Sequence, residues 1–170
     1  PIQVYYRFYY FLSNRLFSIN VDGGFLPTFT LINWESKLKS SFSYADKQKS
    51  FSFLNITDQF SEQIDWNYNK HGKLWTYNLN YFDFLNQKEM ISETGVGLIL
   101  DYIKNDNILK DGKEPYPTSL RGINWIKFLA ENKIRNTQID KTLNNHYKIL
   151  FANLEYHFLA NHLLENVFSL

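Results

Sequence analysis

Residues 115–128 read PYPTSLRGINWIKF, and this stretch decides the fold class. Two prolines precede Thr118, a residue type that often caps helix N-termini, and the apolar residues after it recur at helical spacing. The stretch therefore predicts a helix from Leu120 to Ala130. Its polar residues Arg121 and Asn124 share one face of that helix and have Trp125 beside them, so polar groups are expected among aromatic rings.

Further helices are predicted on both sides of this stretch, because apolar residues recur three and four positions apart. They cover Ile2–Phe17, Trp75–Leu85, Ser92–Lys104, Asn136–Tyr156 and Leu163–Leu170. Ser92 is the predicted N-cap of its helix. Short connections rich in Pro, Gly or Asn favour antiparallel helix pairs. Such pairs close into a bundle, a solenoid or a toroid, and periodicity does not choose among the three.

The region between the first helix and the later ones is predicted to be irregular. The first helix ends near Asp22-Gly23-Gly24, and helical periodicity is poor from there to Lys73. The segment Phe51–Ile56 alternates loosely and predicts a short strand, with at most one short strand pair in the region. The remainder reads as extended loop pinned by aromatic residues such as Trp34. The sequence thus divides into an irregular, aromatic-rich part at residues 1–73 and a helical part at residues 74–170.

Charge and cysteine content exclude several classes of protein. The 18 basic and 17 acidic residues give a net charge of +1 and are spread along the chain, which argues against a nucleic-acid binder. The absence of cysteine excludes disulfides and thiolate chemistry. No apolar run approaches the ~20 residues that span a bilayer. The sequence starts at Pro1 without a signal peptide, so we expect either a processed leader or a segment of a longer protein.

Aromatic residues and asparagine are unusually frequent. Phe, Tyr and Trp make up 18% of the chain, and asparagine occurs 19 times. Aromatic faces and amide groups are what proteins use to hold sugar rings, so the composition is compatible with glycan binding. Codon usage in a low-GC genome produces the same composition, and composition by itself favours that second interpretation.

Polar groups lie among aromatic residues in four motifs, which cover residues 64–67 (IDWN), 73–83 (KLWTYNLNYFD), 115–128 (PYPTSLRGINWIKF) and 153–166 (NLEYHFLANHLLEN). In these motifs and in their order, the chain resembles the heparinase II/III-like family of polysaccharide lyases. The helix predicted at the start of the chain looks like the leading segment of that family. Asn80 stands where many relatives carry His, and Ala160 where many carry Gly.

The resemblance implies an all-α chain that forms part of an incomplete (α/α) toroid of antiparallel helix pairs. It also implies that further helices and an antiparallel β-domain of the same protein follow. Members of the family cleave uronic-acid-containing polysaccharides by β-elimination. The partner implied is therefore an acidic polysaccharide of the heparin, heparan or alginate kind. A bacterial periplasm or cell envelope is the compartment implied, although the sequence itself leaves the compartment open.

The resemblance places the catalytic residues near the end of the sequence. Asn161 is expected to neutralise the uronate carboxylate, and His162 to act as base or to orient the substrate. The ordinary alternatives are an N-cap for Asn161 and a core histidine for His162. The family's leaving-group tyrosine, a later histidine and any zinc ligands come after this sequence, so the chain by itself is expected to be inactive. No metal or cofactor is expected here.

Five further residues are candidates for substrate binding, namely Arg121, Asn124, Trp125, Asn78 and Tyr116. We expect Arg121 and Asn124 to face one concave surface together with Asn161 and His162. The alternatives for Arg121 are a capping role or an ion pair with Glu131 or Asp101, and for Trp125 a place in the core. Two other functions remain open: a non-catalytic glycan-binding protein of the same fold in a capsule or exopolysaccharide pathway, and a helical scaffold that binds proteins.

Overall fold

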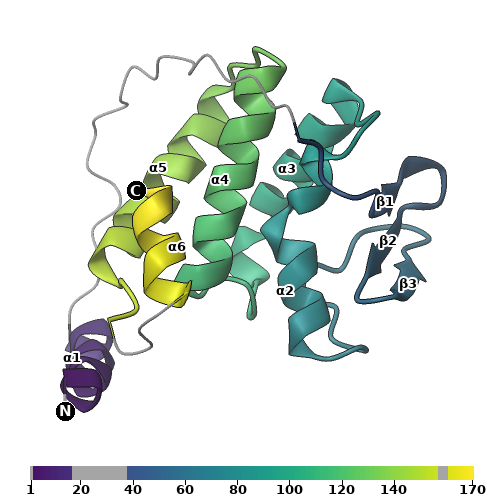
Figure 1. The fold of residues 1–170 in the computed structure, drawn as a ribbon. Helices are drawn as coiled ribbons and strands as arrows, with labels where there is room; N and C mark the ends of the chain where they lie inside the picture. The colour runs from purple at the N-terminus through teal and green to yellow at the C-terminus, as the bar shows by residue number, and fades with distance from the viewer. Residues whose placement is uncertain (1, 17–37, 157–160) are drawn as a thin grey trace.

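The computed structural model describes residues 2–16, 38–156 and 161–170. The described chain is mostly helical, with six α-helices and a small antiparallel sheet (Figure 1). The helices are α1 (Ile2–Leu16), α2 (Lys73–Tyr81), α3 (Ser92–Lys104), α4 (Pro115–Glu131), α5 (Thr137–Ala152) and α6 (Asn161–Ser169). The strands are β1 (Tyr44–Ala45), β2 (Ser50–Phe53) and β3 (Ile56–Gln59). None of the described helices is long and apolar enough to cross a membrane.

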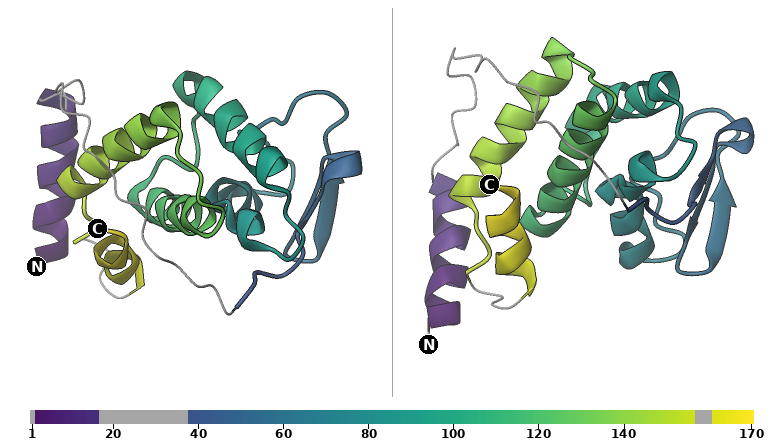
Figure 2. Two further views of the ribbon diagram at one scale, coloured as in Figure 1. Left: turned by 90° about the horizontal axis from the view of Figure 1, so that it is seen from above. Right: turned by 45° about the horizontal axis from the view of Figure 1, so that its top comes forward.

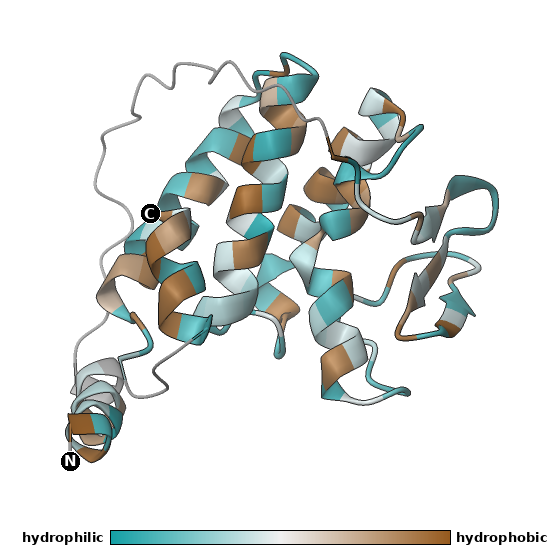
Figure 3. Cartoon of the chain, viewed as in Figure 1, coloured by the Kyte–Doolittle hydropathy of each residue, from teal (hydrophilic) through white to brown (hydrophobic). Residues whose placement is uncertain are grey.

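Helix α4 lies at the centre of the helical layer. It packs against α2, α5 and α6, and a short connection at residues 132–136 turns the chain back from α4 into the antiparallel α5 (Figure 1). The sheet lies at one end of the molecule and α1 at the other (Figure 2). Hydrophobic residues form interrupted bands along α4 and α5, as expected for helices with one buried face (Figure 3).

The sheet corrects the expectation of at most one strand pair. Its order is β1-β2-β3, with both pairs antiparallel. Phe51–Ile56 is not one strand, because Leu54 and Asn55 have φ of 55° and 62° and turn β2 back into β3. A two-residue turn with both φ values positive matches the twist of a hairpin. Strand β1 has only two residues, too few for any alternating pattern to reveal it.

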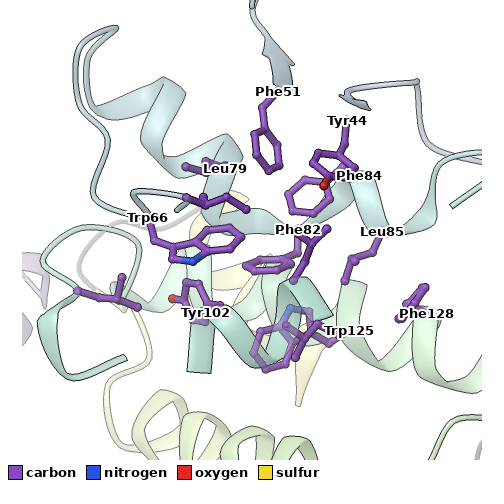
Figure 4. Packing of buried hydrophobic residues seen from close by; sticks show 14 of the residues in the cluster. Tyr44, Phe51, Trp66, Leu79, Phe82, Phe84, Leu85, Tyr102, Trp125 and Phe128 are labelled. Carbon is purple, nitrogen blue, oxygen red and sulfur yellow. The ribbon is translucent and has the colours of Figure 1, made fainter. Parts of the chain in front are cut away.

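The core is a cluster of aromatic rings between the sheet and the helices. Phe82 lies between two tryptophans, 4.9 Å from the ring of Trp66 and 5.4 Å from that of Trp125 (Figure 4). Phe82 has a φ of 60° and ends α2, so the helix predicted over Trp75–Leu85 breaks into α2 and a short 3-10 helix at Asp83–Asn86. Phe82 has no exposed surface, so burial of its ring accompanies and offsets the cost of the positive φ.

The N-terminal ends of α3, α4 and α5 differ in how they are capped. Asn136 caps α5, since its Oδ1 accepts hydrogen bonds from the backbone of Gln138 at 3.0 Å and of Ile139 at 3.2 Å. The caps predicted for the two preceding helices are wrong. Ser92 lies inside α3 and donates to Asn132, and Thr118 lies inside α4, which begins at Pro115. The backbone N–H groups of the first helical turn have no acceptor within the helix. Proline carries no such N–H group and is favoured at this position, so α4 begins at its prolines.

The extents of the predicted helices agree in part with the structure. From Leu74 onward the described residues contain no strand, which confirms the helical part. Helix α1 is confirmed as far as Leu16, and α5 ends at Ala152 rather than Tyr156. The turn predicted at residues 22–24 and the place of Trp34 lie outside the described residues.

Candidate functional site

Arg121 is buried, and its two terminal nitrogens hold parts of the fold together. Its side chain is 1% exposed, and its Nη1 donates to the backbone oxygens of Gly112 at 2.7 Å and Asn80 at 3.3 Å. Its Nη2 donates to Thr118 Oγ1 at 3.2 Å, and the guanidinium lies over the ring of Tyr102. Three acceptors from separate segments thus converge on one cation. The residue joins the end of α2 to the loop before α4.

Asn124 and Trp125 are also buried. The Asn124 amide donates to the backbone oxygen of Tyr81 at 2.9 Å and accepts from Asn86 at 3.1 Å. Trp125 has no exposed surface and packs in the aromatic core. The prediction that Arg121 and Asn124 face a concave surface with Asn161 is therefore wrong. Their assignment to substrate binding stays a prediction that these buried positions do not favour.

Four rings line up where α2, α4 and α6 meet. The Tyr116 and His162 rings have centroids 4.4 Å apart and are tilted by 36°. The ring centroids of Tyr116 and Tyr81 are 6.0 Å apart, and those of Tyr81 and Tyr77 are 6.3 Å apart. All four residues are half-buried, so each ring keeps part of its surface in solvent. We call Tyr77, Tyr81, Tyr116 and His162 the tyrosine–histidine row.

Supporting residues fix the histidine end of the row. Nδ1 of His162 lies 3.3 Å from Oε2 of Glu155, whose own side chain is nearly buried, while the histidine is 42% exposed. The backbone N–H of Glu155 donates to Asn166, and Asn166 donates to Ser119 Oγ on α4 at 2.9 Å. These contacts tie α6 and the segment before it to the start of α4. The ring of His162 is therefore held beside Tyr116 by residues from two other elements.

Sequence reasoning overlooked Glu155 and Asn166 as members of the site. Asn166 follows His162 by four residues in α6, the spacing at which two side chains lie on one face of a helix. That spacing could have revealed it. Glu155 lies in the same motif, but the chain between it and α6 gives no periodic signal that would place its carboxylate.

The tyrosine end of the row carries an ion pair. The hydroxyl of Tyr77 donates to Oε1 of Glu114 at 2.6 Å, and Nζ of Lys73 lies 2.7 Å from the same oxygen. Burial, together with the Glu114 hydrogen bond, raises the pKa of Tyr77 to about 12. Asn78, predicted to bind substrate, is half-buried on α2 and donates to the backbone oxygen of Leu74. Its amide hydrogen bond is therefore made within α2.

Asn161 is exposed and is the first residue of α6. It precedes His162, so the structure brings together Asn161, His162 and Tyr116 of the seven predicted residues. Burial raises the pKa of Tyr116, and the nearby carboxylates of Glu165 and Glu155 raise it further. Tyr116 is therefore a hydrogen-bond donor at neutral pH. An amide, an imidazole and a protonated phenol on one exposed end can bind hydroxyl and carboxylate groups and can exchange protons.

The described hollows lie elsewhere. A pocket of about 360 Å³ lies between the sheet and α3 and has Tyr44, Asp46, Lys49, Gly97 and Asp101 in its wall. Two smaller ones, of about 310 and 200 Å³, share residues with it. Within residues 2–16, 38–156 and 161–170, no group of three or more His, Asp or Glu side chains is arranged to hold a metal ion.

The comparisons with known proteins were made for the whole chain. No protein-family model, no curated protein and no solved structure matches it.

Proposed function

We propose that the chain is the N-terminal part of a polysaccharide lyase that cleaves a uronic-acid-containing polysaccharide by β-elimination, and that it contacts the glycan at the tyrosine–histidine row. The single observation that carries the proposal is the placement of Tyr116 against His162, beside the exposed Asn161. These three residues come from motifs that lie some forty residues apart in the sequence. The resemblance to heparinase II/III-like lyases supplies the reaction.

The chemistry of β-elimination suits these groups. The reaction removes the proton on C5 of the uronate and expels the oxygen on C4. The neighbouring carboxylate must lose its negative character as the C5 carbanion forms, which the amide of Asn161 can favour through a hydrogen bond. His162 can accept the C5 proton, and its contact with the Glu155 carboxylate stabilises the imidazolium that results. The exposed ring surfaces of Tyr81 and Tyr116 offer a support for the apolar face of a sugar.

We further propose that the helices belong to an incomplete (α/α) toroid. The antiparallel pair formed by α4 and α5 supports this arrangement, as does the packing of α2 and α6 on the other sides of α4. In such a ring, helices that are far apart in sequence come together at one end. The tyrosine–histidine row fits such an arrangement, because α2, α4 and α6 each contribute residues to it.

A non-catalytic glycan-binding protein of the same fold is the second candidate. The observation in its favour is that Tyr116 presents the flat side of its ring to His162, with the planes tilted by only 36°. Rings in such face-to-face contact can support a sugar but do not by themselves pass a proton. This candidate predicts the same binding residues and no chemistry in any longer form of the protein.

Glycan binding by the 170-residue chain tests the proposal. Heparan sulfate, hyaluronan, chondroitin and alginate are titrated against the chain by calorimetry, with neutral dextran as the reference polymer. We expect a uronate polymer to bind and His162→Ala or Tyr116→Ala to weaken it by at least about tenfold. Phe42→Ala is the matched control, because Phe42 is an exposed aromatic residue near the sheet. If no uronate polymer binds, or if the three variants bind alike, the row is not a glycan site.

A further inference from the structure

Helix α1 turns its less apolar side toward the protein. Tyr6, Tyr10 and Ser13 are half-buried, and Tyr6 stacks on Tyr156 with ring centroids 4.9 Å apart. These positions recur at i, i+4 and i+7, which is one stripe of a helix. An ordinary surface helix would place its most apolar residues on that stripe. Tyrosine and serine occupy it here.

The opposite side of α1 is strongly apolar and open to solvent. Val4, Phe8 and Phe11 are between 60% and 65% exposed, and Leu12 is 39% exposed. Four residues at this spacing lie along one arc of the helix, on the side away from Tyr156. We call Val4, Phe8, Phe11 and Leu12 the outward face of α1. Figure 2 shows α1 at the edge of the molecule, where a flat surface can reach it.

The charge of the segment identifies what covers this face. The first 21 residues contain Arg7 and Arg15 and no acidic residue. A symmetric contact between two copies of α1 would bring arginines together without any carboxylate to pair with them. An anionic surface instead complements the positive charge of the segment. Phenylalanine and tyrosine beside arginine are also the composition of helices that lie in the interface of a membrane.

We propose that the outward face of α1 binds the surface of a membrane that contains anionic lipid. The helix has 15 residues and is about 22 Å long, which is shorter than the ~30 Å hydrocarbon core, so it lies in the plane of the interface and does not cross it. The phenylalanine rings enter the boundary between headgroups and acyl chains, and Arg7 contacts lipid phosphates. The inference does not depend on the proposed lyase function.

Co-sedimentation of the whole chain with vesicles tests this inference. Vesicles of phosphatidylcholine alone are compared with vesicles that also contain phosphatidylglycerol, at low and high salt. We expect binding to the anionic vesicles that weakens with salt and falls by at least about tenfold in the double variant Phe8→Ser, Phe11→Ser. The matched control is Phe42→Ser with Leu54→Ser, which removes two exposed apolar residues near the sheet and should bind like the parent. Circular dichroism checks that each variant keeps its helices.

Three results would overturn the inference. One is equal binding to both kinds of vesicle, and another is anionic binding that the Phe8→Ser, Phe11→Ser variant retains. The third is the absence of vesicle binding, with sedimentation equilibrium that shows a dimer of the parent, lost in that variant. In that case the outward face belongs to a second copy of the chain.

Discussion

Arg121 lies where the end of α2, the loop at Gly112 and α4 meet. Replacing it with methionine keeps much of the volume but leaves the backbone oxygens of Asn80 and Gly112 without their donor. Buried acceptors left in this way each cost about 1–3 kcal/mol, so Arg121→Met should lower the free energy of unfolding by about 3 kcal/mol. Urea denaturation followed by tryptophan fluorescence measures the change. A variant of undiminished stability that had lost glycan binding would restore Arg121 as a ligand residue.

Asp58 predicts a pH dependence of stability. The hydroxyl of Tyr68 donates to its carboxylate, Nε2 of His71 lies 2.8 Å away and Nζ of Lys70 lies 3.6 Å away. The Tyr68 hydrogen bond, followed by that of His71, lowers the pKa of Asp58 well below the ~3.9 of an unfolded aspartate. The unfolded chain therefore binds the proton first, so this stabilisation is complete above about pH 5 and is lost as pH falls below about 4.

The variant Asp58→Asn separates this contribution from other acidic groups. At neutral pH it should melt a few degrees below the parent, because a charged hydrogen-bond acceptor has been lost. The difference should shrink as the pH is lowered through about 4, and thermal melts by circular dichroism over this range measure it. Melting curves that stay equally far apart at every pH would show that the cluster does not titrate as described.

Sequence reasoning at the residue scale identified polar residues among rings but not which of them are exposed. Arg121 and Asn161 both occur in such motifs, yet the first is buried and the second is exposed. Part of the difference arises because the end of α2 supplies one acceptor to Arg121, the backbone oxygen of Asn80, from about forty residues away. A local pattern holds no information about partners at that distance.

Two glycines in α3 give a matched test of helix packing. A Cβ on Gly95 would lie 2.3 Å from the ring of Phe128 on α4, whereas one on Gly97 would meet nothing within 4 Å. We expect Gly95→Ala to destabilise the fold by about 1–3 kcal/mol through overpacking. Gly97→Ala should instead stabilise it by up to about 1 kcal/mol, because alanine is the better helix former. Chemical denaturation of both variants measures the pair, and equal effects would mean that α3 and α4 do not cross at Gly95.

The same comparison explains which elements were predictable. Helix α5 has its start and its apolar spacing within one segment, so both were found from sequence. Glycine usually weakens a helix, but Gly95 of α3 leaves room for the ring of Phe128. Helix α2 ends at Phe82 because its ring enters the core there, and no local breaker such as Gly or Pro marks that position. Tertiary packing decided the features that were missed.

At the scale of the whole molecule, aromatic residues serve three separate places. Rings such as Trp66, Phe82 and Trp125 fill the core between the sheet and the helices (Figure 4). The tyrosine–histidine row and the outward face of α1 keep their rings in contact with solvent. Many of the aromatic residues therefore pack in the core. Composition counts them in the same way as aromatic residues that bind sugars. The two exposed sets are the ones that the glycan and vesicle experiments test.

The last prediction concerns polysaccharide cleavage by the 170-residue chain. β-Elimination needs a neutralised carboxylate, a base and a leaving-group acid in one geometry, and each proton-transfer group typically contributes ~10²–10⁴-fold to the rate. Asn161 and His162 can supply the first two, but Tyr116 meets His162 through its ring and not as an aligned acid across a bound sugar. We therefore expect this chain to bind a uronate polymer without cleaving it. Incubation with the four polymers, followed by ultraviolet absorbance of the unsaturated uronate, measures cleavage. Turnover that disappears in Asn161→Ala would show that the described residues already form a complete active site.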